Sequence, residues 1–214
     1  MNPKVILESW DNLENLDFSE VFMIVDMQPF FIWENSLPNT VKLHYHSLRS
    51  NIIRKMESVL ENGWLIVNIE YTSTWWLMRW TIKEISSILS QNKQNVIMLE
   101  KHSSWLLGFV HDEEWIQQQW KSKRTLDFIK QREVSIQISG IHASKCVRNT
   151  AKDIKSYWCV TRVLMWHILN LNDVDTTFEQ SNQLCEVRAD YWKSWHLLDY
   201  WGKPINLSSL TDYL

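Results

Sequence analysis

The chain has 214 residues, of which 45% are hydrophobic, and a formal net charge of −3 at neutral pH. This length and apolar content favour one domain, over residues 1–214, with a sizeable core. Lysine and arginine gather on no predicted face, so the charge pattern argues against a nucleic-acid partner.

No segment is typical of a membrane or secreted protein. No apolar run reaches the roughly 18 residues that cross a bilayer, and residues 1–18 lack an apolar leader. The three cysteines, Cys146, Cys159 and Cys185, have no paired or metal-type spacing, and their odd number argues against a disulfide framework. We therefore expect a soluble cytoplasmic protein with at least one free thiol and no membrane partner.

Short apolar runs, often β-branched, alternate along the chain with segments of helical periodicity. In chain order we expect a strand at 21–26, a helix at 40–62, a strand at 64–71, a helix at 81–90, a strand at 95–101, a helix at 113–131, a strand at 134–141, a helix at 146–157 and a strand at 159–165. Strands separated by helices pair in parallel rather than as hairpins. The predicted fold class is α/β, a three-layer αβα sandwich with a mainly parallel, Rossmann-like central sheet.

Residues with useful chemistry follow the ends of three predicted strands. Asp26 ends the first strand, Lys101 ends the third, and the segment from Gly140 to Cys146 follows the fourth. Ligands of open parallel sheets bind beyond the carboxyl ends of the strands, where loops and helix N-termini converge. We therefore expect these residues to share one edge of the sheet.

Cys146 is the candidate nucleophile. A thiol becomes nucleophilic when it ionises, and its pKa falls beside a cation or at a helix N-terminus. Cys146 begins a predicted helix and Lys101 offers the cation, so we expect a lowered pKa for this thiol. Asp26 would accept the thiol proton, and backbone N–H groups at the Cys146 turn would bind the oxyanion.

Each of these residues also has an ordinary structural interpretation. A lone cysteine near a helix start is more often a small buried filler. An aspartate at a strand end is commonly a cap or turn residue, and most lysines are solvated. For the catalytic interpretation to be wrong, however, all three ordinary interpretations must hold at one edge of the sheet.

Three segments resemble the signatures of a known superfamily: VFMIVDMQPFF, VIMLEKHSSW and SGIHASKCVRNTAKD. They resemble, in the same order, motifs of the isochorismatase-like cysteine hydrolases, which include nicotinamidases, N-carbamoylsarcosine amidohydrolases and isochorismatases. The similarity runs over about residues 20–165 and is strongest around the cysteine. It implies Asp26 as general base and acid, Lys101 as the stabilising cation and Cys146 as nucleophile. It also implies a cis peptide between Ile141 and His142 that aims the His142 N–H, together with that of Cys146, at the oxyanion.

The sequence departs from this superfamily at three places. Nicotinamidases carry a metal site built on a D-x-H pattern after the second strand, where this chain reads IEYTSTWW. The histidines nearby in the chain lack ligand spacing: His44, His46, His102 and His111. We therefore predict no metal and no cofactor. His142 stands where the family has a small residue, and Trp158 where it has glycine.

Four further residues at strand ends are candidates for the walls of a small-molecule pocket: Gln28, Phe31, Tyr71 and Trp105. Core packing is the alternative explanation for each of them. Glu70 is expected to orient a neighbour through a hydrogen bond.

The function that these features predict is cleavage of a C–N amide-type bond of a small molecule through a covalent thioester. Two alternatives stay open: vinyl-ether hydrolysis of the isochorismatase type, and a catalytically silent relative that serves as a binding or assembly module. Relatives usually assemble, and the 14 tryptophans suit buried subunit contacts, so we expect a homodimer or homotetramer.

Overall fold

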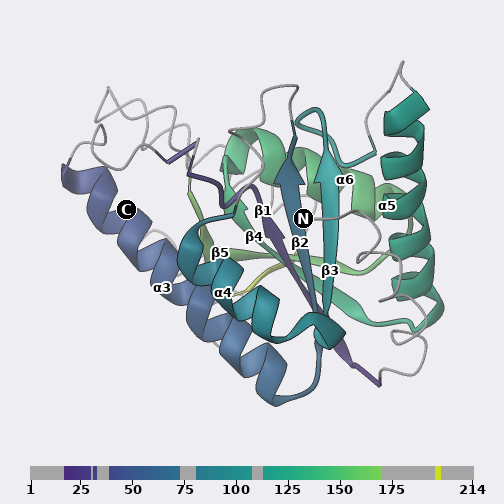
Figure 1. Ribbon diagram of the computed structural model, residues 1–214, viewed down its shortest axis with the longest axis horizontal. Coiled ribbons are helices and arrows are strands. Elements are labelled where there is room, and N and C mark those ends of the chain that lie inside the picture. The colour runs from purple at the N-terminus through teal and green to yellow at the C-terminus, as the bar shows by residue number, and fades with distance from the viewer. Residues whose placement is uncertain are drawn as a thin grey trace.

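The structure of the chain is a computed structural model, which describes residues 17–29, 31–32, 39–72, 81–107, 113–169 and 196–198. Its centre is a parallel β-sheet with helices on both faces (Figure 1). The α/β sandwich expected from the sequence is confirmed. Cys185 and His111 lie outside the described residues.

The elements follow the predicted alternation of strands and helices. They are β1 (Glu20–Val25), α3 (Asn39–Glu61), β2 (Leu65–Tyr71), α4 (Lys83–Gln91), a 3₁₀ turn (Lys93–Asn95), β3 (Val96–Lys101), α5 (Glu113–Gln131), β4 (Ser135–Ile141), a π-helical turn (Ala143–Val147), α6 (Arg148–Ser156), β5 (Thr161–Leu169) and β6 (His196–Leu198). Two boundaries differ clearly from prediction. The helical segment with Cys146 starts earlier, at Ala143, and β5 runs on to Leu169, where its pairing with β4 shifts register.

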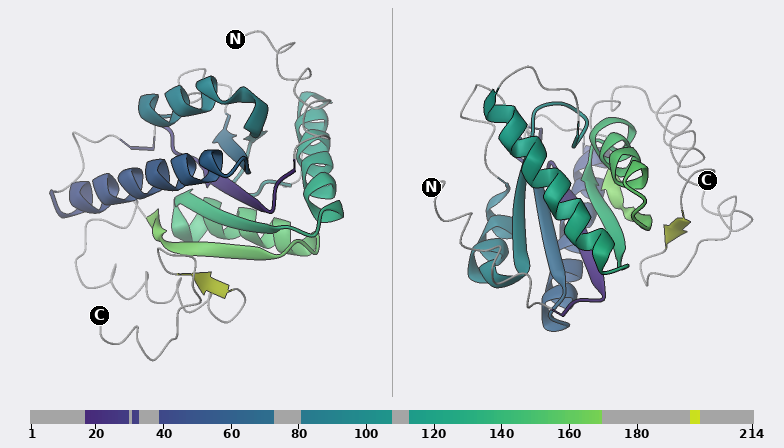
Figure 2. Two further views of the ribbon diagram at one scale, coloured as in Figure 1. Left: turned by 90° about the horizontal axis from the view of Figure 1, so that it is seen from below. Right: turned by 90° about the vertical axis from the view of Figure 1, so that its right-hand side faces the viewer.

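Alternation along the strands explains why the sheet is covered on both sides. In β1, Phe22 and Ile24 belong to the core under α3 and α4, whereas Val21, Met23 and Val25 belong to the core under α5 and α6. Side chains of a strand point alternately to opposite faces, so a run that is apolar throughout must be buried on both. The right-hand view in Figure 2 shows α4 and α6 on opposite sides of the strands.

The strand order positions the candidate site. The sheet runs β3-β2-β1-β4-β5-β6, and every described pairing is parallel. The chain therefore builds outward from β1 to β3 and then crosses back to β4, which lies on the other side of β1. The loops after β1 and β4 diverge at this switch point, where ligands bind in open α/β sheets. Asp26 follows β1 directly, and Cys146 follows β4.

Gly140 lets β4 approach β1 closely beside the site. Its φ is +131°, and a Cβ built there would lie 2.1 Å from the carbonyl oxygen of Val25, the residue before Asp26. No side-chain rotation relieves a clash with backbone, and the φ itself disfavours an L side chain. A glycine is therefore required at this position.

We expect Gly140→Ala to lower the free energy of unfolding by about 3 kcal/mol or more, because the backbone strain at a positive φ adds to the overpacking of the new Cβ against Val25. Thermal unfolding with a denaturant titration measures the loss. Gly63→Ala is the matched control, since Gly63 also has a positive φ (+70°) but open space around its Cβ position. It should cost about 1 kcal/mol. Equal losses in the two variants would contradict the close approach at Gly140.

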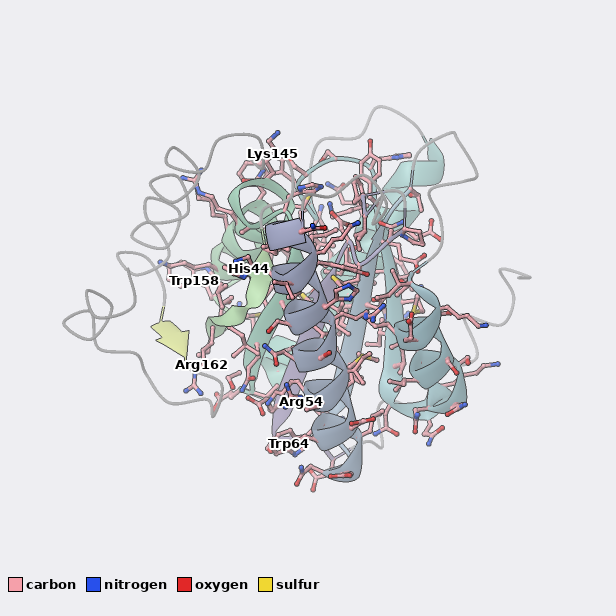
Figure 3. The ribbon with its side chains drawn as sticks, turned by 90° about the vertical axis from the view of Figure 1, so that its left-hand side faces the viewer. His44, Arg54, Trp64, Lys145, Trp158 and Arg162 are labelled. Atoms are coloured by element: carbon pink, nitrogen blue, oxygen red, sulfur yellow. The ribbon has the colours of Figure 1, made fainter. Side chains whose placement is uncertain are left out.

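Trp158 occupies the left-handed position that ends α6. Its φ is +64°, its N–H donates to the carbonyl of Lys155 at 2.9 Å, and the N–H of Cys159 donates to that of Ile154 at 3.4 Å. These two bonds form a Schellman motif, whose left-handed residue is usually glycine. The glycine that the resemblance implies at this position thus has a structural reason. Here an indole that is 84% exposed takes its place, on the outer surface (Figure 3).

We expect Trp158→Gly to raise the free energy of unfolding by about 1 kcal/mol, because glycine adopts the left-handed conformation without steric cost and the exposed indole loses little burial. A chemical denaturation curve measures the gain. Lys152→Gly in the middle of α6 should have the opposite sign, with a loss of about 1 kcal/mol. A destabilised Trp158→Gly protein would show that the indole makes stabilising contacts.

Among the described residues, no helix combines the length and the apolar character needed to span a membrane.

Candidate active site

Asp26, Lys101 and Cys146 come together at the carboxyl edge of the sheet. Figure 3 shows this edge at the top, where Lys145 lies next to Cys146, while Trp64, which precedes β2, lies at the opposite edge. The three residues are far apart in the sequence and reach one place because β1, β3 and β4 run in the same direction.

A buried ion pair joins Lys101 to Asp26. The Lys101 Nζ lies 2.8 Å from the Asp26 Oδ2, and both side chains are fully buried. Burial works against a charged ammonium, but the Asp26 carboxylate and the Cys146 sulfur outweigh it, so the pKa of Lys101 is raised. A lysine without these partners would be solvated, so the ordinary interpretation of Lys101 is wrong.

Asp26 itself has an unusual backbone. Its φ is +55°, a conformation that few residues other than glycine, asparagine and aspartate adopt. Its N–H donates to the carbonyl of Ile69 in β2 at 2.9 Å, and its carbonyl accepts from the N–H of Gln28 at 2.7 Å. The turn after β1 therefore sends the carboxylate toward Lys101 under local strain, which often marks functional positions.

Cys146 lies close enough to Asp26 and Lys101 for both charges to act on its thiol, and its side chain is almost fully buried. The lowered thiol pKa expected from the sequence is wrong. Burial and then the Asp26 carboxylate raise the pKa of Cys146 to about 12, and the Lys101 ammonium only partly offsets them. At neutral pH the resting site therefore contains a neutral thiol beside an ion pair.

A group whose pKa is raised keeps its proton as pH rises past its usual value, so little Cys146 thiolate exists at neutral pH. We expect iodoacetamide to alkylate Cys146 at least ~10-fold more slowly than free cysteine near neutral pH. The rate should climb with pH up to about pH 10 without a plateau. Peptide mapping by mass spectrometry measures it for each cysteine. A plateau with a midpoint below about pH 8 would contradict the neutral resting thiol.

The segment that carries Cys146 is a π-helical turn that runs directly into α6. The carbonyl of His142 accepts the N–H groups of Lys145 at 3.1 Å and Val147 at 3.2 Å, which fixes the start of this turn. The cis peptide expected between Ile141 and His142 is wrong, since every peptide bond among the described residues is trans. The role of the His142 and Cys146 N–H groups in binding an oxyanion stays a prediction.

Three aromatic rings gather next to the ion pair. Phe31 meets His142 nearly edge-on at a centroid distance of 5.3 Å and Tyr71 at 5.8 Å. The Lys101 Nζ lies 5.5 Å from the centre of the Tyr71 ring. A cation over an aromatic face is stabilised by the ring quadrupole. His142, Phe31 and Tyr71 therefore form one aromatic cluster beside Lys101, although they come from three different segments.

The other two pocket candidates are placed differently. The buried Gln28 pairs its amide with the backbone of Tyr71, donating to its carbonyl at 2.9 Å and accepting its N–H at 2.8 Å. It thus ties the turn after β1 to the end of β2. Trp105 is 40% exposed in the loop after β3. A pocket role for Gln28, Phe31, Tyr71 and Trp105 stays a prediction.

Among the described residues, the end of β2 offers no cluster of metal-ligating side chains. Glu70, at the start of the stretch that replaces the D-x-H pattern, accepts the N–H of Thr81 at 3.0 Å and also its hydroxyl. Burial raises the pKa of Glu70, which further weakens it as an anionic ligand. Thr72 donates its N–H to the Lys101 carbonyl. Thr81 is the neighbour that Glu70 orients.

Sequence reasoning missed two residues of α6 near the site. Asn149 donates to the Ser104 hydroxyl at 2.8 Å, and Asp153 accepts the N–H of Leu107 at 2.7 Å. Both contacts hold the loop that follows Lys101. Asn149 and Asp153 lie in the cysteine motif, so their position next to the nucleophile was the available signal.

No family model matches the sequence, and no curated protein sequence matches it either. Solved structures do share its fold. A nicotinamidase from Staphylococcus aureus has a TM-score of 0.61 at 11% identity, over 84% of this chain and 96% of that one. An isochorismatase-like hydrolase from Alkaliphilus metalliredigens has a TM-score of 0.59 at 14% identity, over 86% and 93% of the two chains. A nicotinamidase from Bacillus subtilis has a TM-score of 0.58 at 13% identity, over 84% and 99%.

These proteins differ almost everywhere from this chain in sequence, yet they superpose over nearly their whole length. The chain therefore has the isochorismatase-like hydrolase fold.

Proposed function

We propose that the protein is a hydrolase that cleaves a C–N amide-type bond of a small molecule through a thioester on Cys146. The observation that supports this most strongly is the buried contact of a carboxylate, an ammonium and a thiol at the switch point of the sheet. Solved proteins of the same fold include proteins described as nicotinamidases and as an isochorismatase-like hydrolase. Fold likeness alone does not carry a reaction, so the side chains carry the proposal.

In the first step, the Cys146 proton passes to Asp26 while the sulfur attacks the carbonyl carbon. The raised thiol pKa requires this coupled transfer, because free thiolate is scarce at neutral pH. A C–S bond forms and the carbonyl π electrons move to oxygen. Asp26 becomes neutral as it takes the proton, and the negative charge ends on the substrate oxygen, where backbone N–H groups of the His142–Cys146 turn would bind it.

In the second step, Asp26 returns the proton to nitrogen, the C–N bond breaks, and ammonia or an amine leaves. A water molecule then attacks the thioester, gives its proton to Asp26, and releases the carboxylic acid as Cys146 recovers the proton. Lys101 stays charged throughout, since its pKa is raised. It stabilises Asp26 whenever the carboxylate is ionised and stabilises the sulfur whenever it carries charge.

A screen of small primary amides and carbamoyl compounds for ammonia release tests the proposal. We expect release from at least one compound by the wild-type protein and none by Cys146→Ala. A folded wild-type protein that releases ammonia from no member of the screen and takes up no acyl group on Cys146 would contradict it. That result would favour a catalytically silent binding module.

A further inference from the structure

One side of the helical segment after β4 carries both the nucleophile and a pair of polar anchors. Cys146, Asn149 and Asp153 are spaced i, i+3 and i+7, which places them along one ridge of a helix. The other faces of α6 have different tasks: Ala151 and Ile154 are buried in the core, and Lys152 is exposed.

The anchors bind the loop 102–107 at two points. Asn149 donates its Nδ2 to the Ser104 Oγ at 2.8 Å. Asp153 accepts the backbone N–H of Leu107 on Oδ2 at 2.7 Å, and the N–H of Leu106 also donates to this carboxylate. A carboxylate that receives two backbone N–H groups makes charge-assisted bonds, which are among the stronger hydrogen bonds in proteins.

The anchored loop also binds the ammonium of the site. Loop 102–107 begins directly after Lys101, and the Lys101 Nζ donates to the carbonyl of Ser103 at 3.0 Å. This ammonium is thus held between Asp26 on one side and the loop on the other. Any displacement of the loop therefore moves a hydrogen-bond acceptor of the Lys101 ammonium.

Core packing alone does not explain why the Asp153 carboxylate is partly buried at this place. Burial raises the pKa of Asp153, and the N–H groups of Leu107 and Leu106, followed by the charge of Lys101, only oppose that effect. Partial burial of a carboxylate costs solvation free energy, and α6 already has an apolar face with which to hold a loop. The benefit of the Asp153 carboxylate is geometric, because it fixes the position of loop 102–107 relative to the helical segment that carries the Cys146 sulfur.

We infer that Asn149 and Asp153 are positioning residues that hold the Lys101 ammonium in place against the Cys146 sulfur by anchoring loop 102–107 to α6. This inference rests on the proposed function, in which Lys101 must face the sulfur and Asp26 during thioester formation. A misplacement of about 1 Å at a reacting centre costs up to about 10²-fold in rate.

The first test measures acylation of Cys146 by p-nitrophenyl acetate, from the release of p-nitrophenolate and the mass of the acetylated peptide. Relative to wild type, Asp153→Ala should be acylated about 10- to 100-fold more slowly, and Asn149→Ala about 3- to 10-fold more slowly. Lys152→Ala, on the exposed face of the same helix, is the control and should keep the wild-type rate. Wild-type rates in Asp153→Ala and Asn149→Ala would overturn the inference.

The second test separates positioning from a loss of stability. An anchor that acts through Lys101 has nothing left to position in Lys101→Met, so Asp153→Ala should add less than about 2-fold to the effect of Lys101→Met. If the losses of acylation rate caused by Asp153→Ala and by Lys101→Met multiply in the double variant, the inference is overturned. Should Asp153→Ala fail to fold by circular dichroism, Asn149→Ala combined with Lys101→Met answers the same question.

A third measurement does not depend on any reaction. The buried, hydrogen-bonded Lys101 ammonium should give a ¹⁵N–¹H signal that exposed lysines lose by exchange with water, and Lys101→Met assigns it. We expect Asp153→Ala to shift or abolish this signal and Lys152→Ala to leave it unchanged. An unchanged signal in Asp153→Ala would overturn the inference. Should Cys146 never become acylated in wild type, the proposed function fails, and this signal still decides whether α6 positions Lys101.

Discussion

Replacement of Cys146 by alanine is expected to abolish hydrolysis, with a loss of at least ~10³-fold in kcat/KM. The reason is chemical, because no other described nucleophile lies between Asp26 and Lys101 to form the acyl intermediate. Cys146→Ser should be nearly as inactive, since a hydroxyl is harder still to deprotonate than a thiol of pKa about 12. Steady-state ammonia release with the amide found in the screen measures both.

Cys159→Ala is the matched control for this substitution. Cys159 is also a buried free thiol, but its Sγ faces the carbonyl of Leu126, on α5, at 3.8 Å. It should keep wild-type activity. Wild-type turnover in Cys146→Ala would contradict the thioester route. Combined with loss of activity in Asp26→Asn, it would favour acid catalysis of the kind expected for vinyl-ether hydrolysis, in which the aspartate acts without the cysteine.

Replacement of Lys101 by methionine is expected to remove activity and also to lower the free energy of unfolding by about 3–5 kcal/mol. Methionine fills a similar volume, but it leaves the buried Asp26 carboxylate without the cation 2.8 Å away. An uncompensated buried charge is among the costliest single defects in a protein. Denaturant unfolding followed by tryptophan fluorescence measures the change.

The double variant Lys101→Met/Asp26→Asn separates the two effects. Removal of both charges should restore about half or more of the lost stability, because no unpaired ion remains. Activity should stay absent, since the double variant lacks the proton acceptor as well as the cation. A Lys101→Met protein as stable as wild type would contradict the buried ion pair, and an active double variant would contradict the mechanism.

The layers of the fold were predictable because burial on two faces leaves a plain trace in sequence. The run 21–25 within β1 is apolar at every position, and helical periodicity filled the gaps between such runs. The end of β5 was less predictable. Its register shift against β4 depends on pairing between strands, which no local pattern encodes.

The convergence of Asp26, Lys101 and Cys146 was predictable because parallel strands end at one edge of a sheet. The protonation state of the Cys146 thiol was not predictable in this way. A cation and a helix start argue for a low pKa, but the degree of burial and the distance to Asp26 decide the sign, and both are tertiary quantities.

Two other features could be recognised only in the structure. The partner of Asp153 is 46 residues away in the chain. The place of Asp153 in the cysteine motif therefore indicated that it lies near Cys146, but not which loop it binds. For Trp158, the sequence showed only that it stands where the superfamily has glycine, whereas the structure gives a backbone reason for that glycine in the left-handed φ.

The most direct test of the account is capture of the acyl-enzyme. Wild-type protein is mixed with p-nitrophenyl acetate, quenched in acid within the first turnover, and mapped by mass spectrometry, with Cys146→Ala treated in parallel. The account predicts one acetyl group on the Cys146 peptide of wild type and none at that position in the variant. Acetyl groups that appear equally in both proteins, or never on Cys146, would contradict it.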